Sequence, residues 1–444
     1  DEGAIDGDGR WVSATPIADY GIPEGVREVV GRRLDHLGAD VISALEVAAA
    51  IGPSFSIDVA GDIAGLDERA IDRVVGSAMN AKLIDEGDSA DEFAFAHALV
   101  RQTLYEDLPP RRRIRIHGAV GEALGRRGAP AATVLSHWLK AERPGIALAY
   151  AMAAADEAEK AFAASDMTAN LELALELWDD VDDPVSVAGT PHADLVIRLT
   201  WAQSDFGPAE HEKPIARIST ELERADLGDR TRALLLVTLS RHFKQQGQTA
   251  RARATADEAL RLVPKEEPNE AYAEALAAVA RLRMLNAESS VAISMAEEAI
   301  EIAVASSSER AELQALNTLA TATGQLGRVE ESKHHFEVLA ARADSSGFLR
   351  SQLVGFVNQG SILSFNGYAA EALQLMEQGI ARTRELGVDR WEAMLHGNAA
   401  GLSFELGRWD ETHDHLIAVA PPAAMDASQM NFSLAALTLA GERG

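Results

Sequence analysis

The sequence predicts an all-α chain with one small β element, in which a distinct N-terminal region precedes a right-handed solenoid of helical hairpins. Three observations carry this prediction: a 40-residue spacing of glycines, two columns of small residues in the same register, and an apolar composition of 47% that includes only 5% aromatics. Self-similarity at a fixed period is typical of solenoids, in which each unit packs only on its neighbours.

The glycine column spans the C-terminal half of the chain. Its spacing is constant, since 407 − 367 = 40, and Ala287 occupies the one position without glycine. We expect the first helix of each hairpin to end there, because glycine tolerates the left-handed backbone of a helix terminus. The column comprises Gly207, Gly247, Gly327, Gly367 and Gly407.

Two further columns hold small residues, one before and one after each glycine position. Small side chains at fixed places on two successive helices predict a close approach of those helices. The first column is Ser240, Ala280, Ala320, Gly360 and Ala400, and the second is Ala252, Ala292, Ser332, Ala372 and Thr412.

Composition and the motifs present limit the classes of function that the sequence supports. The net charge of −28 disfavours broad contact with nucleic acid phosphates or anionic membranes. The absence of cysteine and of an export signal favours a cytoplasmic location. No phosphate loop, nucleophile elbow or zinc-protease motif occurs, so the sequence predicts a non-enzymatic chain without a metal or a cofactor of its own.

The turn segments resemble the tetratricopeptide repeat. The matching segments are residues 327–332 (GRVEES), 367–372 (GYAAEA) and 407–412 (GRWDET). The family unit has 34 residues, so we expect the extra residues to lengthen the connections between repeats, around 263–269 and 343–348. A HEAT-like repeat also suits the period, although the glycine turn favours the tetratricopeptide.

Residues 1–127 lack the period. A hairpin signal surrounds Gly7-Asp8-Gly9, and apolar spacing predicts a helix over about 22–37. Further helices are expected at 40–51, 57–64, 67–80, 97–107 and 110–126, with two strands near 83–85 and 92–95. Three helices followed by a β wing is the element order of a winged helix.

Two segments of this region look like parts of MalT-like, LuxR-type regulators, bacterial members of the STAND class of signalling ATPases. They are residues 22–34 (IPEGVREVVGRRL) and 93–105 (FAFAHALVRQTLY). The resemblance implies the end of an ATPase module over 1–38, a winged helix over 39–127 and a tetratricopeptide-like superhelix over 128–444. It also implies that His97, with Arg101 one turn on, contacts the phosphate of ATP or ADP in the parent protein. The alternative is a His97 that caps its own helix or is hydrogen-bonded within the winged helix.

Neither the phosphate loop nor the output helix-turn-helix of such regulators occurs in this chain. The chain begins at Asp1, and residues 428–443 look like the first helix of another hairpin, so we expect a piece of a longer protein. The leading hypothesis is a regulatory arm that binds an effector or a partner protein on its superhelix and relays this to the ATPase module. The alternatives are a tetratricopeptide scaffold for partner peptides, and the regulatory arm of a STAND protein with a nucleotide cyclase output.

Three other clusters have competing interpretations. The basic run 109–115 (PPRRRIR) suits phosphate contact, but a surface helix start is favoured. Residues 410–415 (DETHDH) contain metal-ligand types, yet a solvated helix face is favoured. The aromatic residues of the repeats either line a groove or fill the core, and core is favoured for most. They are Trp201, Phe206, Phe243, Phe336, Phe356, Phe365, Tyr368, Trp391, Phe404 and Trp409.

Overall fold

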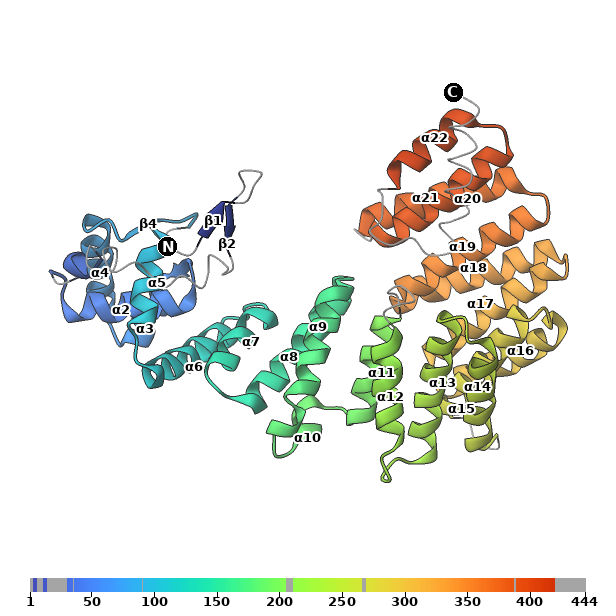
Figure 1. Ribbon diagram of the computed structural model, residues 1–444, viewed down its shortest axis with the longest axis horizontal. Helices are drawn as coiled ribbons and strands as arrows, with labels where there is room; N and C mark the ends of the chain where they lie inside the picture. The colour runs from blue at the N-terminus through green and yellow to red at the C-terminus, as the bar shows by residue number, and fades with distance from the viewer. Residues whose placement is uncertain are drawn as a thin grey trace. The chain divides into compact units, whose positions relative to one another are not determined.

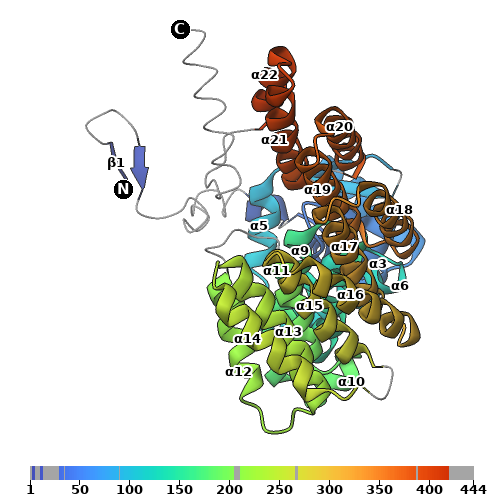
Figure 2. The same ribbon diagram turned by 90° about the vertical axis from the view of Figure 1, so that its right-hand side faces the viewer.

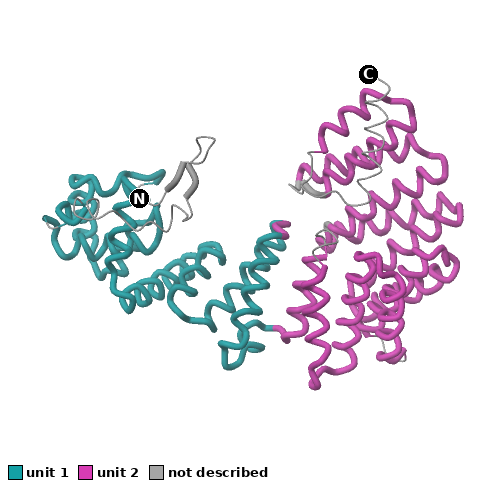
Figure 3. Tube along the Cα trace, in the orientation of Figure 1, with its two compact units in different colours: residues 1–161, 165–189 teal, residues 162–164, 190–444 magenta. Residues whose placement is uncertain are grey.

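The computed structural model describes residues 3–5, 11–13, 30–34, 36–89, 91–204, 211–265, 269–386 and 389–419. It consists of two compact units, each described by itself below (Figure 3). Unit 1 comprises residues 1–161 and 165–189, and unit 2 comprises residues 162–164 and 190–444. The start of the superhelix expected at residue 128 remains a prediction. The expected helix at 428–443 lies outside the described residues.

Unit 1 begins with the expected hairpin and continues as three helices followed by a wing. Strands β1 (Gly3–Ile5) and β2 (Trp11–Ser13) pair antiparallel. Of the helix expected over 22–37, residues 30–34 are helical, whereas residues 36 and 37 form a turn and a bend, so the helix ends before the expected Leu37. The elements that follow are α2 (Ala39–Ile51), β3 (Ser54–Ser56), α3 (Ile57–Ala64), α4 (Glu68–Asn80), β4 (Ile84–Glu86), β5 (Glu92–Phe95), α5 (Ala98–Glu106) and α6 (Pro110–Arg126).

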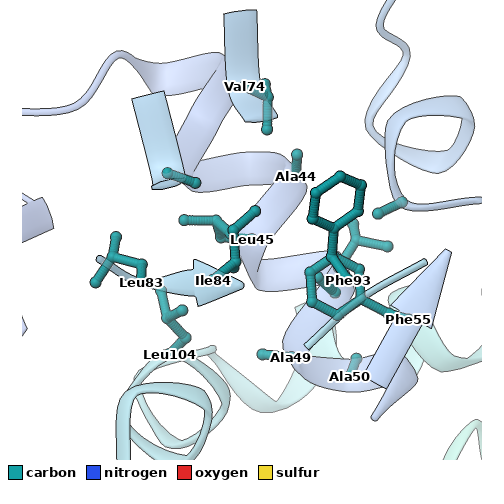
Figure 4. Packing of buried hydrophobic residues seen from close by; sticks show 14 of the residues in the cluster. Ala44, Leu45, Ala49, Ala50, Phe55, Val74, Leu83, Ile84, Phe93 and Leu104 are labelled. Atoms are coloured by element: carbon teal, nitrogen blue, oxygen red, sulfur yellow. The ribbon is translucent and has the colours of Figure 1, made fainter. Parts of the chain in front are cut away.

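Strand β3 was not predicted from the sequence. It pairs antiparallel with β5, which also pairs with β4, so the sheet order is β3-β5-β4. Its central residue Phe55 is buried beside Phe93, and Leu45 of α2 lies in the same apolar cluster (Figure 4). A three-residue strand is too short for its alternation to be recognised in a sequence. Strand β3 is recognised only in the folded chain, from its pairing with β5 and the burial of Phe55.

The remaining helices of unit 1 continue as hairpins. The elements are α7 (Ala131–Lys140), α8 (Pro144–Lys160), α9 (Ala164–Glu176), the short 3-10 helix η2 (Trp178–Asp180) and α10 (Pro184–Ala188). The buried face of α8 is rich in alanine.

Unit 2 is an all-helical, tetratricopeptide-like solenoid (Figures 1 and 2). Its odd-numbered helices pack on one another in succession, whereas each even-numbered helix packs between its own partner and the next odd-numbered helix. The odd-numbered helices therefore form one layer, called here the inner layer. The helices are α11 (His192–Gln203), α12 (Glu212–Leu222), α13 (Asp229–Gln245), α14 (Thr249–Leu262), α15 (Glu270–Leu285), α16 (Ser289–Ala305), α17 (Glu309–Gln325), α18 (Val329–Ser346), α19 (Leu349–Phe365), α20 (Ala369–Leu386), α21 (Asp389–Glu405) and α22 (Trp409–Ala418).

The glycine column ends the odd-numbered helices in left-handed backbone. Gly247, Gly327, Gly367 and Gly407 have φ between 69° and 86°, and Ala287 has φ 61°. These values confirm the role that the spacing predicted, whereas Gly207 lies outside the described residues. Ala287 adopts the same backbone without the freedom of glycine.

The two small-residue columns meet at the interface within each hairpin. Ala280, Ala292, Ala320 and Ala400 are fully buried, and Ser332 Oγ donates a hydrogen bond to the Ala320 carbonyl at 2.7 Å. In the opposite direction, Ser240 Oγ of the first column donates to the Ala252 carbonyl of the second at 2.6 Å. The predicted close approach of paired helices is confirmed.

The extra residues of the 40-residue unit lie partly in the helices. Connection 263–269 separates α14 from α15, as expected. The connection expected at 343–348 is wrong, because α18 remains helical to Ser346 and only Gly347 and Phe348 separate it from α19. The polar run Asp344-Ser345-Ser346 has the composition of a loop. It nevertheless forms the last turn of α18, where polar side chains can remain in contact with solvent.

Ala287 supplies a direct test of the turn. Ala287→Gly is expected to stabilise the protein by about 0.5–1 kcal/mol, because left-handed backbone costs alanine about 1–2 kcal/mol and added unfolded-state freedom offsets part of the gain. Urea unfolding followed by circular dichroism measures the change. The exposed Ala340→Gly in α18 is the matched control and should lose about 1 kcal/mol. A loss at both positions would contradict the explanation.

Every helix in the described ranges falls short of the length and apolarity that crossing a bilayer requires.

Candidate functional site

The inner layer of unit 2 carries a cluster of charged and aromatic side chains. Its centre is Trp201 of α11, and two guanidinium groups lie over its indole. The Arg241 carbon lies 4.1 Å and the Arg310 carbon 4.9 Å from the ring centroid. Cation–π contacts of this kind hold arginine side chains in place while their edges remain able to donate hydrogen bonds. Helices α11, α13 and α17 thus meet at one tryptophan.

Arg310 is also held by a carboxylate of the neighbouring helix. Its Nε donates to Glu274 Oε1 at 2.6 Å, and the Glu274 side chain is fully buried. The other oxygen, Oε2, is buried without a hydrogen-bond partner. A buried carboxylate oxygen without a hydrogen bond costs free energy, so packing alone does not account for Glu274 at this position.

A small cavity borders the same cluster. Its polar lining comes from Arg241, Lys244, Arg281 and Gln314, with Trp201 as one wall. Burial and, to a smaller extent, the positive charge of Arg350 together lower the pKa of Arg281 to about 10. Arg350, from α19, donates through Nη1 to Ser204 Oγ at 3.1 Å. The end of the first helix of unit 2 and the start of its fifth hairpin therefore lie side by side.

An amide pair extends the polar row along the inner layer. Asn358 Nδ2 of α19 donates to Asn317 Oδ1 of α17 at 3.0 Å, and both side chains are half-buried. Trp201 belongs to the aromatic set for which the sequence left groove and core open and favoured core for most, and the arginines and asparagines of the site were not predicted. The available signal was polar residues interrupting the apolar odd-numbered helices, such as Glu274 and Arg281, which are seven apart in α15.

Unit 1 holds the residues that the STAND resemblance singled out. His97 is the N-cap of α5, its side chain is exposed, and it makes no capping hydrogen bond. Arg101 instead donates from Nε to the Ala49 carbonyl at 3.1 Å, which ties α5 to α2. His97 is thus open to solvent, whereas the Arg101 side chain is already engaged. Their contact with a nucleotide remains a prediction.

The basic run is partly used inside unit 1. Arg112 forms an ion pair with Glu46 of α2, and Arg113 donates from Nε to the Leu108 carbonyl at 3.0 Å. These contacts fit the favoured interpretation of a helix start.

The aromatic residues divide between core and surface. Phe243 and Phe336 are buried, whereas Phe365, Tyr368 and Trp409 are exposed. Phe206 lies outside the described residues. Core packing therefore holds for some of the set only, because the residues around the turns face the edge of the solenoid.

Histidines pair at three helix interfaces, which the sequence did not reveal. The two Nδ1 atoms lie 2.9 Å apart in His117–His137, 2.8 Å in His211–His242 and 2.8 Å in His396–His415. His415 is half-buried against α21, so the solvated face expected at 410–415 is wrong at this residue. Among the described residues, no group of three histidine, aspartate or glutamate side chains lies close enough together to hold a metal ion.

Burial of the histidine pairs predicts acid sensitivity. Burial and the partner ring lower the pKa of His117 to about 4 and that of His242 to about 3, and burial with Lys140 lowers that of His137 to about 4. Below pH ~6.5 the unfolded chain therefore binds more protons than the folded chain. The free energy of unfolding that is present above that pH is lost as the pH falls toward 4. The loss is about 1.4 kcal/mol per pH unit for each additional proton.

The measurement is the midpoint of urea unfolding at about pH 7.5 and about pH 5. His137→Phe, which does not titrate, should reduce the difference between the two midpoints. The exposed His334→Phe should leave the difference unchanged. Equal midpoints of the wild-type protein at the two pH values would contradict the prediction.

Comparison with known proteins gives distant structural likeness only. No protein-family model matches the chain, and no curated protein matches its sequence. A STAND protein with a tetratricopeptide repeat sensor from Pyrococcus horikoshii is similar at TM-score 0.40 and 13% identity, covering 93% of this chain and 66% of that one. The chain thus spans about two thirds of that protein.

Two further solved structures match over most of both chains. The apo form of the quorum sensor NprR from B. thuringiensis has TM-score 0.46 and 12% identity, covering 89% of this chain and 98% of that one. Aspartyl phosphate phosphatase F from Bacillus subtilis has TM-score 0.43 and 11% identity, covering 88% and 98%. Scores below 0.5 establish neither shared ancestry nor shared function.

Proposed function

We propose that this chain is a sensing arm that binds an effector or a partner peptide on the inner layer of unit 2. The observation that carries the proposal is Trp201 between Arg241 and Arg310, a tryptophan–arginine cluster on the layer where successive repeats meet. Aromatic and arginine side chains dominate the binding energy of protein interfaces. A solenoid whose inner layer served packing alone would bury apolar residues at these positions.

The finer proposal is that the arm belongs to a LuxR-type, MalT-like STAND regulator. Its support is the resemblance of residues 22–34 and 93–105, together with the solvent-exposed His97 at the N-terminus of α5. A helix N-terminus with a free imidazole suits the phosphate of ADP or ATP. In a longer protein containing this chain and a phosphate loop, His97→Ala should reduce the amount of co-purified nucleotide.

A thermal-shift screen tests the proposed binding face. Metabolites and peptides are added to the chain, and hits are repeated on Trp201→Ala and on Trp409→Ala, an exposed tryptophan of α22. A ligand of the inner layer should raise the melting temperature of the wild-type protein and of Trp409→Ala but not of Trp201→Ala. A hit that stabilises all three equally binds elsewhere and contradicts the proposal. Hits confined to peptides would favour the scaffold alternative.

A further inference from the structure

Positive charges converge on the inner layer of a strongly acidic protein. The chain has 69 acidic and 41 basic residues. Nevertheless Arg241 and Lys244 of α13 and Arg281 of α15 border one small cavity, and Arg350 of α19 lies near enough to Arg281 to repel its charge. Like charges gathered in one place are unfavourable unless a counter-charge joins them.

Arg281 differs from its neighbours in having no acidic partner. Arg310 pairs with Glu274, and Arg342 pairs with Glu312 through two hydrogen bonds of 2.7 and 2.6 Å. Arg283, two residues along α15, pairs with Glu288. Within the described ranges Arg281 makes neither an ion pair nor a hydrogen bond. A partly buried guanidinium whose charge is uncompensated costs free energy, which an arriving anion would recover.

The size of the cavity limits what enters it. Its free volume of about 10 Å³ admits one water-sized atom, so a single oxygen of a ligand can enter beside Arg281 while the rest of its group stays outside. Carboxylates and phosphates match the planar donor geometry of guanidinium and present their oxygens at the end of a larger molecule. Trp201 forms an adjoining wall on which the rest of that molecule can lie.

We propose that Arg281, with Lys244 and Arg350, binds the oxyanion of the ligand taken by the inner layer, either a carboxylate or a phosphate. This inference rests on the proposed binding function and specifies its chemistry. The ligand is therefore anionic at one end, and it reaches the cavity past Trp201.

The test uses the anions themselves as probes. Thermal unfolding is measured in sodium chloride, acetate and phosphate at equal ionic strength, so that general screening is constant. Acetate or phosphate should raise the melting temperature of the wild-type protein above its value in chloride, and the more effective anion identifies the preferred group. Arg281→Gln should abolish the increment. Arg251→Gln removes an arginine that lies over Phe243, away from the cavity, and should retain the increment.

A second variant separates binding from structural support. In chloride, Arg281→Met should melt about 2–4 °C higher than the wild-type protein, because it removes an unpaired, partly buried charge. A lower melting temperature would show that Arg281 supports the fold and would overturn the proposal. Absence of any anion increment, or an increment that persists in Arg281→Gln, would overturn it as well.

The two proposals fail separately. If the screen finds a ligand that requires Trp201 yet binds Arg281→Gln as tightly as wild type, the oxyanion site is wrong and the binding face stands. If acetate or phosphate stabilises the protein through Arg281 while every screen hit also raises the melting temperature of Trp201→Ala, the oxyanion site stands and the proposed function is wrong.

Discussion

Glu274→Ala is expected to lower the free energy of unfolding of unit 2 by about 3 kcal/mol, because Arg310 loses its hydrogen-bonded partner in a buried ion pair and keeps only the charges of Glu270 and Asp194. The Glu274 side chain is fully buried and accepts from Arg310 Nε at 2.6 Å. Its loss leaves Arg310 beside Trp201 and near a second guanidinium, Arg241. Urea unfolding followed by circular dichroism measures the loss.

Glu330→Ala is the matched control for this prediction. Glu330 pairs with Lys333 at 3.2 Å but is 84% exposed, so its removal should cost less than about 0.5 kcal/mol. The double variant Glu274→Ala/Arg310→Met should regain much of the lost stability, because no unpaired charge remains. Equal losses for Glu274→Ala and Glu330→Ala would show that the inner ion pair is energetically ordinary.

Ala320→Leu is expected to destabilise unit 2 by about 2–3 kcal/mol through overpacking. Ala320 is fully buried where α17 meets α18, and its carbonyl accepts from Ser332 Oγ at 2.7 Å. Three added carbons must separate the two helices and break that hydrogen bond. Because each repeat packs on its neighbours, the displacement extends into the adjacent hairpins.

Ala340→Leu supplies the control, since Ala340 is exposed on α18 and leucine is also a good helix former. Its free energy of unfolding should change by less than about 0.5 kcal/mol. Comparable losses at both positions would mean that the small-residue column does not set the helix spacing. The measurement is again the urea midpoint, with the slope of the transition checked for constancy.

Local signals in the chain predicted most of the elements. The glycines that follow α13, α17, α19 and α21 adopt the left-handed backbone that their spacing predicted, as Gly327 does with φ 76°. Helix α4 of unit 1 begins at a capping residue, since Asp67 accepts a hydrogen bond from the Ala70 amide. Strand β3 and the continuation of α18 through Asp344 were missed. Both depend on burial or exposure in the folded chain and not on local preference.

The candidate site was much less predictable. Trp201 was recognised as a possible groove residue, whereas its partners Arg241 and Arg310 come from other repeats and carry no mark in sequence. The histidine pairs show the same limit. His211 and His242 are separated by 31 residues but their Nδ1 atoms lie 2.8 Å apart.

The repeated hairpin, its period and the close contact inside it follow from local sequence, because glycine backbone freedom and side-chain volume act over a few residues. Which charges lie together on the inner layer depends on the folded solenoid. Arg350 donates to Ser204 across 146 residues of chain, and Arg281 lies near Arg350 without an acidic partner. Contacts between residues of distant repeats depend on the rotation of each repeat relative to the one before it. This small rotation accumulates along the solenoid, and the sequence of a single repeat does not specify the sum.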